Sequence, residues 1–171
     1  MPHDEQLGRN DESLDMYRSI YEGTLELSSG REVEIYAAID LAEALLRQSK
    51  YSEAKKFLIP RIREATRFCG PDATLTLELR YHYAAVLFFD ENGTMADQRK
   101  AITTLRNICQ IAEPRSRRAK PRISNASSDD LARLRLELFR GDLGFWEKAI
   151  AVGDGSPART RTHARALRAP G

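Results

Sequence analysis

The stretch that decides the fold is residues 41–58, which read LAEALLRQSKYSEAKKFL. It places two small residues, Ala42 and Ala54, in apolar helical patterns on either side of a short polar turn. The two alanines recur farther along the chain, at spacings of 42 to 48 residues, as Ala84 and Ala101 and again as Ala132 and Ala149. A period of this size is typical of stacked helical repeats, in which each helix pair shares its core with its neighbours.

Apolar residues at three- and four-residue spacings predict helices along most of the chain. The predicted helices cover residues 11–27, 31–49, 51–68, 74–89, 95–112 and 129–139. Gly30 and Gly70 are expected to end helices, because glycine adopts positive φ without steric cost. Pro60 removes a backbone donor within 51–68, and we expect a kink there and not a break.

These patterns predict five segments. They are a disordered N-terminus at 1–10, helical repeats at 11–114, a basic loop at 115–128, a partial third repeat at 129–152 and a disordered basic tail at 153–171. The third repeat is expected to turn at Gly141-Asp142 and to continue as a short piece from Phe145 to Val152. It therefore lacks most of its second helix.

The net charge of +2 hides an asymmetry along the chain. Residues 1–114 carry 14 Lys and Arg against 19 Asp and Glu, whereas residues 115–171 carry 13 against 6. Five of the eight residues from Arg115 to Arg122 are basic, a density that can bind phosphate backbones or act as a nuclear import signal. The other interpretation is a solvated loop, which the lack of interleaved aromatic residues favours.

Catalytic and cofactor motifs are absent from the sequence. There is no Gly-rich phosphate loop, no GxSxG, no HExxH and no CxxC, and the three histidines are far apart. Cys69 and Cys109 are isolated, which fits a reduced intracellular setting. The longest apolar run, Tyr83 to Phe89, is too short to span a bilayer. We therefore expect a soluble cytoplasmic protein that is not an enzyme, uses no cofactor or metal and does not bind membranes.

Residues 11–152 resemble tetratricopeptide repeats of the kinesin-light-chain-like class. The resemblance is carried by Leu41-Ala42, Tyr51, Glu53-Ala54 and Leu58, and by the linker Gly70-Pro71-Asp72-Ala73-Thr74-Leu75. That linker keeps the Gly-Pro-Asp and Thr-Leu of the family pattern but lacks its His-Pro. The resemblance implies an all-α fold, a right-handed superhelical stack of about two and a half antiparallel helix pairs preceded by one helix.

In the resembled family, the first helices of successive repeats line a concave groove that receives peptides. Carried over by register, the groove residues of this chain are Tyr36, Ile39, Glu43, Arg47, Glu78, Tyr81 and Phe88, with Leu46, Ala85 and Phe89 beside them. For Leu46, Phe88 and Phe89, a place in the core between repeats is an equal alternative.

Two functions follow as hypotheses. The first is a protein-interaction module that binds a peptide or a partner helix in this groove, with self-association through an exposed end near Trp146 as a further expectation. The second is a nucleic-acid-associated factor that acts through the basic C-terminal region.

Overall fold

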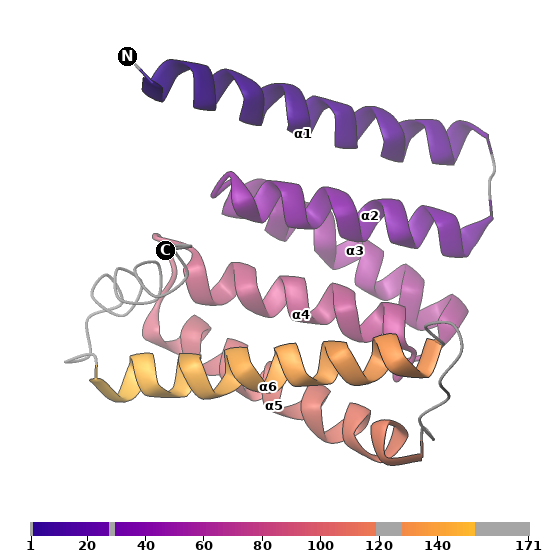
Figure 1. Cartoon of the computed structure of the whole chain (residues 1–171), viewed down its shortest axis with the longest axis vertical. Helices are drawn as coiled ribbons and strands as arrows, with labels where there is room; N and C mark the ends of the chain where they lie inside the picture. The colour runs from indigo at the N-terminus through magenta and orange to yellow at the C-terminus, as the bar shows by residue number, and fades with distance from the viewer. Residues whose placement is uncertain (1, 28–29, 119–127, 153–171) are drawn as a thin grey trace. The chain divides into compact units, whose positions relative to one another are not determined.

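A computed structural model describes the backbone of residues 2–27, 30–118 and 128–152, with side chains described for residues 12–27, 30–113 and 135–151. In these ranges the chain is all-helical and has no strand, as predicted (Figure 1). It divides into two compact units, residues 1–86 and 87–171. The helices are α1 (Pro2–Glu26), α2 (Arg31–Arg47), α3 (Tyr51–Cys69), α4 (Thr74–Phe89), α5 (Met95–Arg118) and α6 (Ser128–Val152).

The bounds of α2, α3 and α4 agree with the predicted helices to within two residues. α3 runs through Pro60 without a break. Gly30 and Gly70 have φ angles of 98° and 99°, which side chains with a Cβ rarely allow, and each lies directly beside a helix end. The glycines therefore separate α1 from α2 and α3 from α4, as predicted.

The turn between α2 and α3 is set by the C-terminal cap of α2. Ser49 has a φ of 58°, and the N–H groups of Ser49 and Lys50 donate to the carbonyls of Leu46 and Leu45 at 3.0 and 2.9 Å. This pair of bonds is a Schellman motif, which satisfies carbonyls that would otherwise lack partners at the helix end. α3 begins at the next residue, Tyr51, so the chain reverses within a few residues.

In the unit of residues 1–86, α2 contacts both α1 and α3. Ala42 of α2 and Ala54 of α3 are completely buried. Helix axes approach to about 8–10 Å where the contact side chains are small. The burial of both alanines is what the predicted hairpin of α2 and α3 requires, and Ala84 and Ala101 are completely buried as well.

The N-terminus differs from the prediction, because α1 begins at Pro2 and not at Asp11. Proline suits the first turn of a helix, where its missing N–H is not needed. Asp4 and Glu5 follow in that turn, where the helix dipole favours negative charge. Residues 2–10 contain almost no apolar side chains, and for that reason the apolar pattern did not reveal this part of the helix.

α5 is longer than predicted and includes the start of the predicted basic loop. It continues past Ala112 to Arg118, so residues 115–118 are helical. Basic residues are favoured at the C-terminal end of a helix because the dipole is negative there. The rest of the basic stretch, residues 119–127, and the predicted tail, residues 153–171, lie outside the described residues.

The third hairpin of the sequence analysis is wrong, because residues 128–152 form the single helix α6. Gly141 and Gly144 lie within it, although each glycine costs about 1 kcal/mol relative to alanine. Five apolar residues at alternating three- and four-residue spacings favour one continuous helix that packs on α5. They are Leu136, Phe139, Leu143, Trp146 and Ile150.

In the unit of residues 87–171, aromatic rings form the core. Trp146 of α6 is completely buried and stacks on Phe88, with ring centroids 4.6 Å apart and an interplanar angle of 9°. Phe89 meets the indole edge to face at 6.0 Å. Trp146 is therefore a core residue, and the expected exposed end near it is wrong.

Two ion pairs show the direction of α6 along α5. Arg106 lies 2.7 Å from Glu147, and Glu113 lies 2.9 Å from Arg140. The later residue of α5, Glu113, pairs with the earlier residue of α6, Arg140. The two helices are therefore antiparallel.

The start of α5 is fixed by a reciprocal cap. The backbone N–H of Thr94 donates to the carboxylate of Asp97 at 2.9 Å, and the N–H of Asp97 donates to the Thr94 hydroxyl at 3.2 Å. This is a capping box with aspartate in the third position. At the C-terminal end of α4, the side-chain amide of Gln98 donates to the Phe88 carbonyl at 3.3 Å. A side chain of α5 thus satisfies one of the last carbonyls of α4.

Replacing Ala54 with phenylalanine is expected to lower the free energy of unfolding by about 1–3 kcal/mol or more, because the ring cannot fit the buried contact of α3. Urea denaturation followed by circular dichroism measures the change. Ser52→Phe, at an exposed position of the same helix, should have little effect. An unchanged Ala54→Phe midpoint would contradict the packing of α2 on α3.

Replacing Thr94 with alanine is expected to cost about 1 kcal/mol, because it leaves N–H groups at the start of α5 without an acceptor. Thermal denaturation gives the comparison. Thr103→Ala is the matched control, since that hydroxyl only donates back to the Arg99 carbonyl within the helix. Equal melting temperatures for the two variants would rule out the cap.

Candidate functional site

α2 presents one exposed stripe, which we call the α2 surface. Its residues follow one another at spacings of three and four, so they lie on one side of the helix. The other sides carry the residues that α2 buries. The α2 surface consists of Val33, Tyr36, Asp40, Glu43 and Arg47, all exposed.

Three of the predicted groove residues lie on this surface. Tyr36 is 50 % exposed, which is unusual for a large aromatic side chain in the middle of a packed helix. Glu43 and Arg47 are also exposed and form an ion pair, with Arg47 Nη2 2.8 Å from Glu43 Oε1. The aromatic ring and the charged pair are therefore available to a partner on the same side of α2.

The other predicted groove residues do not share this exposure. Ile39 and Glu78 are buried, and Phe88 is completely buried beneath Trp146. Tyr81 is half-buried, with its ring edge against His82 at a centroid distance of 5.3 Å. The register placed Ile39 on the wrong side because the buried arc of α2 is wider than half of the helix, and Phe88 and Phe89 belong to the core.

Two carboxylates give the α2 surface a negative bias. Partial desolvation raises the pKa of Asp40, and the nearby negative charge of Glu43 raises it further, while Arg47 opposes the shift. A nearby like charge makes a carboxyl group harder to ionise, and an approaching cation stabilises its ionised form. The surface therefore favours a cationic group beside the Tyr36 ring.

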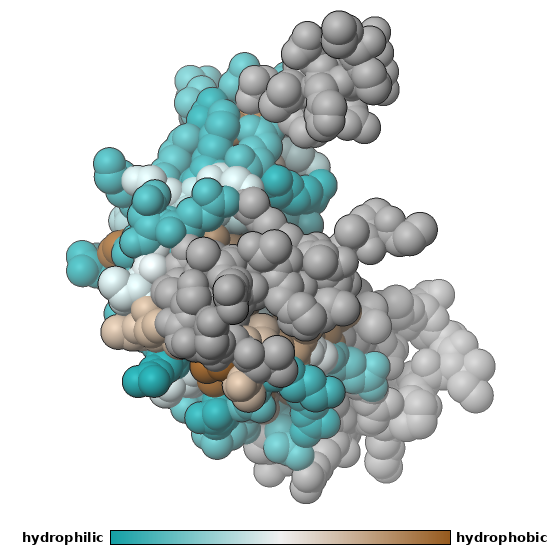
Figure 2. All heavy atoms as spheres, turned by 90° about the vertical axis from the view of Figure 1, so that its left-hand side faces the viewer, coloured by the Kyte–Doolittle hydropathy of each residue, from teal (hydrophilic) through white to brown (hydrophobic). Residues whose placement is uncertain are grey.

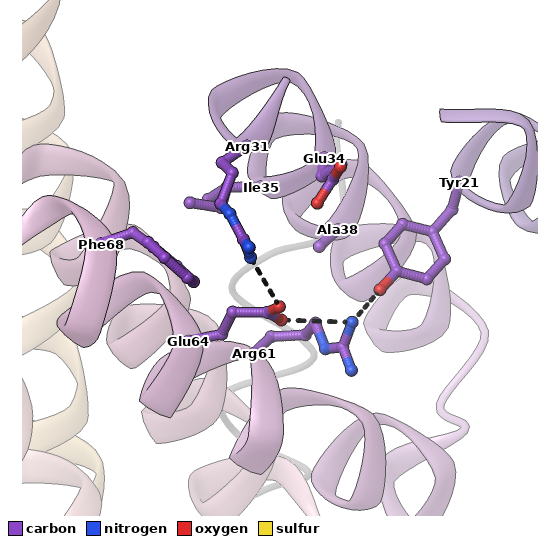
Figure 3. A pocket seen from close by; sticks show the side chains of 8 residues that line it. All are labelled: Tyr21, Arg31, Glu34, Ile35, Ala38, Arg61, Glu64 and Phe68. Carbon is purple, nitrogen blue, oxygen red and sulfur yellow. Dashed lines mark hydrogen bonds and ion pairs between the residues drawn. The ribbon is translucent and has the colours of Figure 1, made fainter. Parts of the chain in front are cut away.

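A second arrangement of polar residues, which we call the polar network, joins α1, α2 and α3 around a small pocket (Figure 3). Arg61 Nη1 donates to the hydroxyl of Tyr21 and lies 3.4 Å from Glu64 Oε2. Glu64 Oε1 lies 3.6 Å from Arg31 Nη1. The Arg31 guanidinium in turn sits over the ring of Phe68, 3.6 Å from its centroid.

Burial gives the Tyr21 end of the network its properties. The tyrosine side chain is 8 % exposed, and its ring meets Phe57 edge to face at 5.2 Å. Desolvation raises the pKa of the Tyr21 phenol, and the positive charge of Arg61 offsets part of the rise. Arg61 Nε is buried without a hydrogen-bond partner among the described residues. The guanidinium is thus committed to Tyr21 and Glu64 through its terminal nitrogens.

The polar network is built to hold helices together. The enclosed space of its pocket is about 10 Å³, enough for roughly one water molecule. Its ion pairs are partly exposed, and pairs of this kind contribute about 0–1 kcal/mol each. The network therefore links α1, α2 and α3 but adds only modestly to the free energy of folding, and we call it the clamp.

Sequence reasoning missed this network. Arg61, Glu64 and Phe68 recur at spacings of three and four on α3, a pattern visible in the sequence. Their partners Tyr21 and Arg31 come from two other helices, however. Which tyrosine and which arginine meet them depends on how α1 and α2 pack.

The remaining described residues offer no metal site and no membrane-spanning helix. Among the described residues, no cluster of three or more His, Cys, Asp or Glu side chains could hold a metal ion. Cys109 is buried, which raises the pKa of its thiol and keeps it protonated and unreactive. Within the described helices there is no apolar stretch that could pass through a lipid bilayer.

Figure 2 shows one face of the molecule, on which most of the described residues are hydrophilic. Hydrophobic residues appear there only in small patches. Comparisons with protein-family models, with curated proteins and with solved structures find no match. The function is therefore argued from the residues themselves.

The stability of the unit of residues 1–86 is expected to fall as the pH rises above about 10, because folded Tyr21 keeps its proton after the unfolded chain has lost it. Urea midpoints measured from about pH 9 to about pH 11 report the fall. Tyr21→Phe should flatten this part of the profile. Identical profiles for wild type and Tyr21→Phe would contradict the buried phenol.

Proposed function

We propose that this chain is a protein-interaction module that binds a peptide or a partner helix through the α2 surface and carries out no catalysis. The observation that supports it most is the half-exposed ring of Tyr36 on a helix whose other sides are buried. Exposed aromatic residues on a rigid support are typical anchors of protein interfaces, since they add contact area at a low entropic cost.

The architecture that we propose around this surface is a tetratricopeptide-like stack. It is supported by the complete burial of Ala42 and Ala54 in two helices that touch and by the short capped turn between them. The proposed stack includes the hairpin of α2 with α3. A second hairpin, formed by residues 74–89 and 95–112, stays a prediction.

The preferred ligand follows from the charges of the α2 surface. Asp40 lies about one helical turn from Tyr36 and Glu43 about two turns, and Glu43 is already paired with Arg47. A peptide with a Lys or Arg next to a large apolar residue can satisfy the carboxylates while its apolar side chain covers the tyrosine ring. Such charges set register and association rate more than affinity.

Peptides selected from a random display library against the whole chain are expected to bind through Tyr36. Tyr36→Ala should weaken binding of a selected peptide at least about tenfold, the effect of losing an interface anchor. Fluorescence anisotropy with the labelled peptide measures the dissociation constants.

Two control variants sharpen this test. Leu138→Ala, at an exposed apolar position of α6, should leave the affinity unchanged. Arg47→Ala frees Glu43 and should not reduce the affinity for a basic peptide. Selected peptides that bind wild type and Tyr36→Ala equally well would remove the α2 surface from the proposal.

A further inference from the structure

α1 carries apolar residues on two sides, and only one of them faces the rest of its unit. Leu14 and Tyr21 are buried on the inner side. Met16, Ile20 and Leu27 are 53 %, 48 % and 79 % exposed. Leu27 directly follows the last residue of α1, and its N–H donates to the Gly23 carbonyl at 3.0 Å, which continues the helical course by one residue. Together with Gly23 the three exposed residues follow spacings of four, three and four, the spacing of a seam that receives a second helix. We call Met16, Ile20, Gly23 and Leu27 the α1 seam.

Gly23 supplies a second observation at the centre of the seam. A Cβ added at this position would meet nothing within 4 Å, so the packing of the chain itself does not require glycine there. Glycine inside a helix is destabilising relative to alanine or glutamine, which the same space would accept. A partner helix that approaches the backbone closely at this point would require the absence of a side chain.

The flank of the seam is acidic. Glu12, Asp15, Glu22 and Glu26 are all exposed along one edge of it. Asp15 pairs with Arg18 at 3.0 Å, whereas the three glutamates have no ion-pair partner among the described residues. A partner with basic residues beside its apolar stripe would neutralise this edge.

This charge arrangement also argues against an antiparallel pairing of α1 with a second copy of the chain. In an antiparallel two-fold pairing of α1 with α1, the same edge of each helix lies on the same side of the pair. The glutamates of both copies would then face one another, which is unfavourable. A basic helix has no such conflict.

We propose that the α1 seam binds a basic amphipathic helix of a partner protein. This site is separate from the α2 surface, so either can fail without the other. The apolar stripe of the partner covers Met16, Ile20 and Leu27, its backbone comes closest at Gly23, and its basic residues lie along the glutamates.

The test uses two labelled synthetic helices with leucine at the seam positions, one flanked by lysine and the other by glutamate. The lysine peptide is expected to bind the whole chain at least tenfold more tightly than the glutamate peptide. Ile20→Ser should weaken it at least tenfold, while Ile59→Ser, an exposed control on α3, and Tyr36→Ala should not. Glu12→Gln combined with Glu22→Gln and Glu26→Gln should reduce the preference for lysine.

Gly23→Gln separates a binding role from a structural one. Because nothing occupies the space beside Gly23, this variant is expected to keep its fold and to melt about 2–4 °C higher. Its affinity for the lysine peptide is nevertheless expected to fall at least tenfold. Unchanged affinity in Gly23→Gln or in Ile20→Ser would overturn the proposal.

The same samples also test two other occupants of the α1 seam, a second copy of the chain and the chain's own residues 153–171. Concentration-dependent dimerisation that Ile20→Ser abolishes, measured by sedimentation velocity, would assign the seam to a second copy. A tenfold or greater gain in affinity for the lysine peptide on deletion of residues 153–171 would assign it to the chain's own basic segment. Either result would overturn the proposal, and a monomer with the same affinity with or without these residues supports it.

Discussion

The packing of α2 is the constraint on which the rest of its unit depends. Ala42 and Ala54 are completely buried on two helices that contact each other, so a larger side chain at either position would have to displace its neighbours. The Schellman cap at Ser49 closes the turn from α2 to α3, and the clamp joins α1 to α3 through Tyr21, Arg61 and Glu64. With its other sides buried in this way, α2 has one side left for a partner.

The helices of the central part could be predicted because their sequence signals are local. Apolar periodicity and two glycines at positive φ were enough to place α2, α3 and α4. The sequence signals failed in residues 128–152, where the cost of glycine in a helix competes with the burial of apolar side chains. Gly141 suggested a turn, but burial of the stripe through Trp146 outweighs the glycine penalty, and α6 is one helix.

The candidate site was only partly predictable, for a related reason. Tyr36, Glu43 and Arg47, which were placed by the register of the resembled family, are exposed on one side of α2. Ile39 and Phe88 were misplaced, because burial depends on which neighbours cover a residue. The polar network was missed entirely, since it joins three helices, and the acidic edge of α1 became meaningful only once its inner side was known.

The most direct test of the central claim is to map a bound peptide by amide chemical shifts in the isotope-labelled chain. If one side of α2 is the binding surface, the largest shifts on adding a display-selected peptide should fall on residues 33–47, with Tyr36 and Glu43 among them. Shifts centred instead on the clamp residues Tyr21, Arg61 and Glu64, with α2's exposed stripe unaffected, would contradict the account.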